Sequence, residues 1–116
     1  MNQRANEAVS RLQQLCGGPR DGALLRVTLA NALLAQGDAI AAIGELRRAL
    51  GFDPDYSAAW KLLGNTLVES NDTQAAADAY RAGIAAAIKR GDKQAENEMQ
   101  VFLRRLQKRR RDAAPG

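Results

Sequence analysis

The sequence repeats itself at an interval of 34 residues. When the chain is shifted by that interval, small residues align with small ones and large apolar residues with large ones. The aligned pairs are Leu29 with Leu63, Ala30 with Gly64, Asn31 with Asn65, Leu33 with Leu67, Ala42 with Ala76, Leu46 with Tyr80 and Ala49 with Gly83. The turn dipeptides Gly37-Asp38 and Asn71-Asp72 align as well. A helical bundle has no reason to repeat its turns at one interval, so the pattern predicts a stack of helical repeats, an α-solenoid.

Apolar residues at helical spacing predict about six antiparallel helices joined by short turns. No segment alternates with a period of two, so we expect an all-α fold without a sheet. The predicted organisation is one domain over residues 1–116, with a degenerate N-terminal helix over 3–16, a first repeat over 22–51, a second repeat over 55–90, a basic C-terminal capping helix over 92–111 and a disordered tail over 112–116.

The second repeat carries a recognisable motif. Its residues are Trp60-x2-Leu63-Gly64-x2-Leu67, followed by Ala76-x3-Tyr80. The motif resembles that of the tetratricopeptide repeat (TPR) family, in particular a small stand-alone bacterial-type member. Leu67 replaces the tyrosine of the family pattern, and Arg26 stands where the first repeat would have tryptophan. The resemblance covers roughly residues 23–90 and implies a scaffold that binds other proteins.

Composition argues against an enzyme. Histidine, the commonest general base and metal ligand, is absent. The single cysteine, Cys16, cannot form an internal disulfide, in keeping with a reducing compartment. The polar N-terminal segment has no apolar signal core. We therefore expect a non-catalytic cytoplasmic protein without cofactor or metal, in which Cys16 is a small buried hydrophobic residue.

One face of the predicted helix around Trp60 is apolar. Trp60, Leu63, Gly64 and Leu67 share a face at helical spacing, which we interpret as packing between paired helices rather than as a ligand site. Phe52, Tyr80 and Phe102 are expected to be packing residues as well.

The resemblance implies a concave groove lined by the first helix of each repeat, on the opposite face. The residues expected there are Leu24, Val27, Asn31, Leu34, Ala58, Lys61, Asn65, Val68 and Glu69. Asparagine can hydrogen-bond a peptide backbone, and lysine can meet a carboxylate. We expect a peptide segment or a partner helix to bind here, unless this face is only solvated.

Lys61 and Asn65 also resemble part of a clamp with which some TPR domains hold a C-terminal carboxylate. The other members of that clamp have no clear match in this chain. Replacing both residues with alanine is predicted to abolish partner capture at unchanged thermal stability.

The net charge of +4 lies entirely in residues 59–116. Six cations crowd the end of the last helix: Arg104, Arg105, Lys108, Arg109, Arg110 and Arg111. Two interpretations stand: a solvated terminal helix whose cations suit its C-terminal dipole, or a surface that binds nucleic acid or an anionic membrane. No aromatic residue lies among the six to stack on a base. An unpaired face on the first helix would also allow a homodimer.

Overall fold

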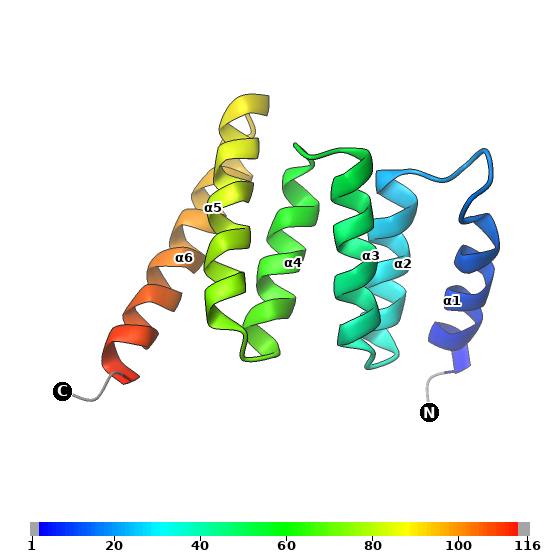
Figure 1. Ribbon diagram of the computed structural model, residues 1–116, viewed down its shortest axis with the longest axis horizontal. Helices are drawn as coiled ribbons and strands as arrows, with labels where there is room; N and C mark the ends of the chain where they lie inside the picture. The colour runs from blue at the N-terminus through cyan, green and yellow to red at the C-terminus, as the bar shows by residue number, and fades with distance from the viewer. Residues whose placement is uncertain (1–2, 114–116) are drawn as a thin grey trace. The chain divides into compact units, whose positions relative to one another are not determined.

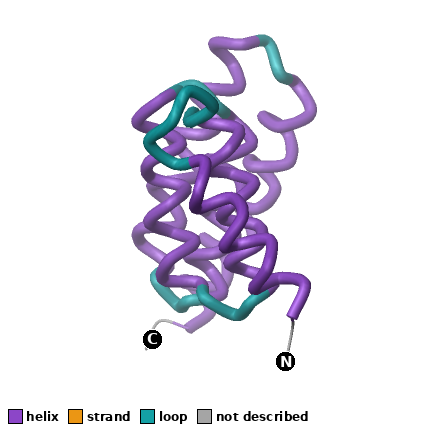
Figure 2. Tube along the Cα trace, turned by 90° about the vertical axis from the view of Figure 1, so that its right-hand side faces the viewer, coloured by secondary structure: helices purple, strands orange, loops and turns teal. Residues whose placement is uncertain are grey.

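The computed structural model describes residues 3–113, which form six helices (Figure 1). The helices are α1 (Gln3–Leu15), α2 (Ala23–Ala35), α3 (Ala39–Phe52), α4 (Ser57–Glu69), α5 (Thr73–Arg90) and α6 (Lys93–Ala113). Turns and short loops join them, and no strand occurs within the described part of the chain (Figure 2). The predicted all-α, TPR-like fold of six helices is confirmed.

The helix ends differ slightly from the sequence prediction. α1 stops at Leu15, which leaves Cys16 in the turn that follows. α6 continues through Asp112 and Ala113, where the sequence predicts the start of a disordered tail. The rest of that predicted tail, residues 114–116, lies outside the described residues.

Three turns use the same chemistry. Gly37, Asn71 and Gly91 adopt left-handed backbone angles, with φ of 85°, 62° and 71°. The aspartate after each of them donates its N–H to the carbonyl five residues earlier, at 2.8–3.0 Å, which closes the preceding helix in a Schellman motif. Its carboxylate then accepts a hydrogen bond from the N–H three residues later, at 3.1–3.2 Å, and so caps the next helix. The repeat of turn residues in the sequence is therefore a repeat of turn geometry.

The chain divides into two compact units, described here separately. Unit 1, residues 1–54, contains α1, α2 and α3, and α2 packs against both other helices. Leu29 and Leu46 are the large side chains at its centre, each at most 1% exposed. Ala30, Ala42 and Ala49 are fully buried beside them and allow the helices to approach closely.

Unit 2, residues 55–116, contains α4, α5 and α6, with α5 packed against both neighbours. Leu63, Met99 and Leu106 are its largest fully buried side chains. Two glycines set the helix spacing. A Cβ at Gly64 would lie 2.6 Å from Cδ1 of Tyr80, and a Cβ at Gly83 would lie 2.7 Å from Cβ of Trp60 and collide with Met99.

The predicted packing face of α4 is largely confirmed. Leu63 and Leu67 are 1% and 4% exposed, Gly64 is buried, and Trp60 is half-buried. Tyr80 is 2% exposed, and its ring lies 5.8 Å from that of Phe102.

Two of the expected packing residues are more exposed than the sequence suggests. The prediction is wrong for Phe52, the last residue of α3, which is 54% exposed. Phe52 lies about 120° around the helix from buried Leu46, so it falls outside the apolar stripe. Cys16 is only half-buried, and its thiol donates a hydrogen bond to the carbonyl of Leu12 at 3.6 Å.

Candidate functional site

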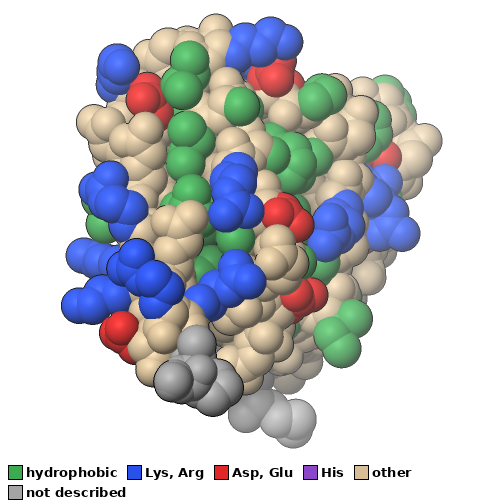
Figure 3. Space-filling view, turned by 60° about the vertical axis from the view of Figure 1, so that its left-hand side comes forward, with side chains coloured by type: hydrophobic (Ala, Val, Ile, Leu, Met, Phe, Trp, Pro, Cys, Tyr) green, Lys and Arg blue, Asp and Glu red, His purple; other side chains and the backbone are tan. Residues whose placement is uncertain are grey.

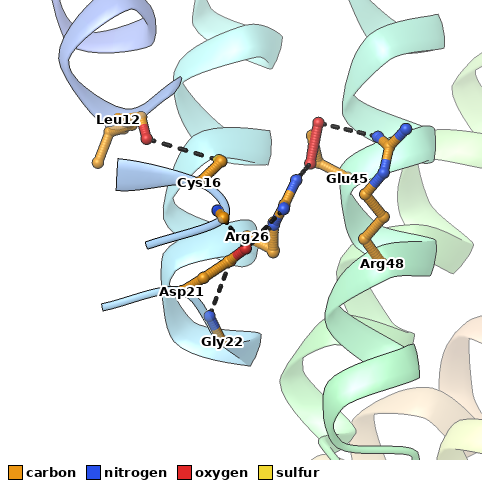
Figure 4. A network of polar contacts seen from close by, with 8 residues as sticks. Leu12, Cys16, Asp21, Gly22, Arg26, Glu45 and Arg48 are labelled. Atoms are coloured by element: carbon orange, nitrogen blue, oxygen red, sulfur yellow. Dashed lines mark hydrogen bonds and ion pairs between the residues drawn. The ribbon is translucent and has the colours of Figure 1, made fainter. Parts of the chain in front are cut away.

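Unit 1 contains a polar network around Arg26, at the position that holds tryptophan in the second repeat (Figure 4). Its guanidinium makes two bonds to Asp21, Nε to Oδ1 at 2.9 Å and Nη2 to Oδ2 at 2.8 Å. Nη1 donates to Glu45 on α3 at 2.7 Å, and Glu45 also pairs with Arg48 at 3.0 Å. A planar fork of donors thus takes the place of an aromatic ring and ties α2 to α3.

The same network fixes the loop between α1 and α2. The Asp21 carboxylate also accepts the backbone N–H groups of Gly17 and Gly22, at 2.7 and 2.9 Å. The bond from Arg26, helped by these N–H groups, lowers the pKa of Asp21 to about 2. Hydrogen bonds to Asp21 and Glu45 in turn raise the pKa of Arg26. The Asp21 and Glu45 carboxylates and the Arg26 guanidinium bond to one another and to the loop backbone, so we assign the network a structural role.

In unit 2, Lys61 forms an ion pair with Glu98 of the same chain. Its Nζ lies 3.3 Å from Oε2 of Glu98 on α6, and the two side chains are 32% and 36% exposed. The pair borders an open hollow of about 220 Å³ between α4 and α6, lined by Ala58, Lys61, Asp92, Gln94, Ala95 and Glu98. One cation and two carboxylates make this surface net negative.

Asn65 is held by a buried tyrosine. The Tyr80 hydroxyl donates to Oδ1 of Asn65 at 2.6 Å. Burial, with a contribution from the charge of Glu69, raises the pKa of Tyr80. Replacing Asn65 with alanine would leave this hydroxyl without its acceptor, at a cost of about 1 kcal/mol or more. The predicted Lys61→Ala, Asn65→Ala variant is therefore not neutral for stability, because sequence reasoning missed the Tyr80 contact.

Most of the predicted groove residues are accessible. On α4, Ala58 and Glu69 are exposed, whereas Lys61, Asn65 and Val68 are half-buried. We call these five residues the α4 polar face.

On α2, Leu24 is 69% exposed, Asn31 is exposed and Leu34 is half-buried. Val27 is only 9% exposed and belongs to the core, contrary to its predicted place in an open groove. Val27 is buried because α2 packs against both α1 and α3, which together cover more of its surface than one neighbouring helix would.

The six predicted cations at the end of α6 are all exposed. We call them the α6 basic patch: Arg104, Arg105, Lys108, Arg109, Arg110 and Arg111. Arg110 donates to the side-chain oxygen of Gln74 on α5 at 3.0 Å. Within residues 3–113 none of the six forms an ion pair with a carboxylate. Lys and Arg side chains gather on this side of the molecule (Figure 3).

Within the described residues, no group of three or more cysteine and acidic side chains is arranged to hold a metal ion. No helix in the same range combines the length and the apolar character needed to cross a membrane.

Comparison with protein families matches residues 33–90 to the tetratricopeptide repeat, the part of the chain that holds the turns at Gly37 and Asn71 and the close contact at Gly64. The chain belongs to the tetratricopeptide repeat family. A TPR repeat-containing protein of Pseudomonas aeruginosa is 43% identical over 102 residues, which cover 88% of this TPR chain and 97% of the relative.

Solved protein structures also resemble this chain in sequence and fold. A protein from Bordetella parapertussis, known from a solution structure, is 44% identical with a TM-score of 0.74, covering 87% of this TPR chain and 88% of that one. The TPR domain of Sgt2 from Aspergillus fumigatus is 26% identical with a TM-score of 0.73, covering 98% of this chain and 76% of that one. TPR folds generally mediate protein–protein interactions and are generally non-catalytic.

Proposed function

We propose that this TPR chain is a non-catalytic adaptor that binds a peptide segment or a helix of another protein through the α4 polar face. The observation that carries the proposal is that, in the described part of the chain, the Asn65 side chain uses its oxygen inside the protein but not its N–H groups. Its Oδ1 is occupied by the Tyr80 hydroxyl at 2.6 Å, while its amide N–H groups have no acceptor within residues 3–113.

An amide fixed in this way is a preorganised donor. The Tyr80 bond and the helix backbone hold Asn65 in one orientation, so little side-chain freedom is lost when a ligand binds. A peptide carbonyl is the natural acceptor for such an amide, since it is present at every residue of an extended segment.

The surroundings of Lys61 favour a neutral or basic segment over a C-terminal carboxylate. An anionic group would have to displace Glu98 from Lys61 and would approach Asp92 in the same hollow. Both steps oppose binding of a carboxylate. Support for the carboxylate clamp is therefore weaker than support for a peptide backbone.

Unit 1 offers a second, more apolar face with matching residues. Leu24, Asn31 and Leu34 lie 34 residues before Ala58, Asn65 and Val68, respectively. We propose these three residues as a separate binding surface of unit 1, with two apolar contacts and a further amide donor.

The test replaces Lys61 with alanine and Asn65 with aspartate. Aspartate keeps an oxygen acceptor for the Tyr80 hydroxyl but removes the N–H donors, so the fold is expected to remain intact. Wild-type and variant chains are immobilised, and proteins captured from cells that make the chain are identified by mass spectrometry. Arg47→Ala, an exposed change on α3, is the control.

A partner should be recovered by the wild type and the control, and its recovery by the double variant should fall about tenfold or more. Loss of about 1.4 kcal/mol corresponds to each factor of ten. Loss of the part-exposed Lys61–Glu98 pair should lower the stability of the double variant by no more than about 1 kcal/mol, so circular dichroism should show it folded under the assay conditions. Undiminished recovery by the double variant would refute the proposal.

A further inference from the structure

The α6 basic patch is more positive than a solvated helix end requires. Residues 104–113 contain six cations and a single carboxylate, Asp112. Arg104 with Lys108 and Arg105 with Arg109 are like-charge pairs four residues apart, which disfavour the helix by a few tenths of a kcal/mol each. A mixture of both signs would make the surface equally soluble without this repulsion. The excess of one sign therefore points to an anionic ligand.

Five of the six cations form two rows along α6, and the sixth, Arg110, is bonded to Gln74 on α5. At about 100° per residue, Arg104, Lys108 and Arg111 lie within an arc of about 60°. Arg105 and Arg109 form the second row, and the two rows together cover about 160° of the helix surface. A flat surface touches a cylinder along one line, whereas a groove with two charged walls can contact both rows.

The neighbouring elements leave the patch positive. On α5, the Asp78 carboxylate is paired with Arg81 at 3.4 Å. The Asp72 carboxylate caps the first turn of α5 through the N–H of Ala75. At that same turn an open hollow of about 370 Å³ extends the patch, lined by Thr73, Arg109, Arg110 and Ala113.

The patch lacks the features of a protein or membrane contact. Protein interfaces have apolar or aromatic centres, and interfacial membrane helices expose an apolar face. The large hydrophobic residues exposed in the described chain are Leu24, Ile40, Phe52 and Ile88, none of which lies on α6. The apolar residues of α6 are buried at Ala95, Met99 and Leu106 and half-buried at Val101, Phe102 and Leu103, so within residues 93–113 no large apolar side chain is fully exposed. Five arginines among six cations suit phosphate oxygens, which accept their paired N–H donors.

We infer that the α6 basic patch binds double-stranded nucleic acid, with α6 lying in a groove and its two rows contacting phosphates on the two walls. The major groove of a DNA duplex is about 12 Å wide and admits one α-helix. Among residues 93–113 the one aromatic side chain is Phe102, which is half-buried beside Tyr80 and is not free to stack on bases. Binding is therefore to the backbone and independent of sequence. This activity is separate from the proposed adaptor role of the α4 polar face.

The test measures binding of the full chain to a fluorescein-labelled, mixed-sequence DNA duplex of about 20 base pairs by anisotropy, from about 25 to 200 mM salt. If five phosphates are neutralised, the logarithm of the association constant falls with the logarithm of the salt concentration at a slope of about −4.5. Arg104→Gln with Lys108→Gln and Arg111→Gln should reduce the slope by about 2.7, and Arg105→Gln with Arg109→Gln by about 1.8.

Arg4→Gln, Arg11→Gln and Arg20→Gln remove three exposed charges from unit 1 and serve as the control, which should retain the slope. Circular dichroism checks that each variant is folded. A slope of about −1, or an equal reduction of the slope in the control and in the first-row variant, would overturn the inference. So would tighter binding to phosphatidylglycerol vesicles or to polyglutamate than to the duplex at equal anionic charge and salt.

Discussion

Replacing Gly64 with alanine should destabilise the protein, although alanine is the better helix former. A Cβ at this position would lie 2.6 Å from Cδ1 and 2.9 Å from Cζ of Tyr80. The ring has little freedom to move, because its hydroxyl is bonded to Asn65 and the Phe102 ring packs beside it at a tilt of 45°. The substitution therefore forces either a clash or the loss of the hydroxyl bond.

The magnitude follows from three contributions. Overpacking a well-packed core costs about 1–3 kcal/mol, and losing the hydrogen bond costs about 1 kcal/mol. The higher helix propensity of alanine stabilises the folded state by about 1 kcal/mol. The net expectation is a loss of about 1–3 kcal/mol, with a shift in melting temperature of about 3–6 °C per kcal/mol for a chain of this size.

Gly44→Ala is the matched control. Gly44 is also in the interior of a helix, but a Cβ there would have Arg48 Nη1 as its nearest neighbour at an ordinary 3.7 Å. This variant should be stabilised by about 0.5–1 kcal/mol, because only the propensity term applies. Urea denaturation followed by circular dichroism measures both variants. A Gly64→Ala protein as stable as the wild type would refute the packing interpretation of this face.

Two further variants test the polar contacts. In the folded protein the pKa of Asp21 is about 2, below its ordinary value of 3.8. Its bond to Arg26 therefore stabilises the fold above pH 3.8, and that contribution is lost as the pH falls toward 2. Asp21→Asn should therefore lower the urea midpoint at pH 7, and the difference from wild type should shrink between pH 4 and about 2; a difference independent of pH would contradict the assignment. Tyr80→Phe should cost about 1 kcal/mol, because Asn65 Oδ1 loses its donor. The wild type should also lose stability above about pH 10, because the pKa of the Tyr80 hydroxyl is raised in the folded protein. Tyr80→Phe should lack the part of this loss that Tyr80 contributes.

The sequence was sufficient to predict the fold because its strongest signals are local and repeated. The glycine or asparagine before each capping aspartate predicts a left-handed turn, which is what the structure has at Gly37, Asn71 and Gly91. The spacing of Trp60, Leu63 and Gly64 reports a packing face, because residues three and four apart lie together on a helix.

Contacts between helices were harder to predict. The pairing of Lys61 with Glu98 and of Asn65 with Tyr80 depends on which helix faces which, information that periodicity within one helix does not contain. Arg26 in place of tryptophan was a usable signal, because a cation at a packing position requires an anionic partner. Asp21 and Glu45 supply that partner.

Side-chain exposure was predicted less well for residues at the border of an apolar helix face. The position of Phe52 about 120° from Leu46 could have shown that it lies outside the stripe of α3. The burial of Val27 could not have been found in this way, since α2 is covered by two neighbours and the residue lies at the edge of its apolar arc.

The central claim is that α4 packs with one face and binds a protein with the other, and nuclear magnetic resonance tests it most directly. The side-chain amide signals of Asn65 are followed in a ¹⁵N-labelled chain as a captured partner is added. We expect a saturable shift of the Asn65 side-chain signals and of backbone amides at Lys61 and Val68. Saturable binding that leaves these signals unchanged and shifts only the end of α6 would contradict the claim.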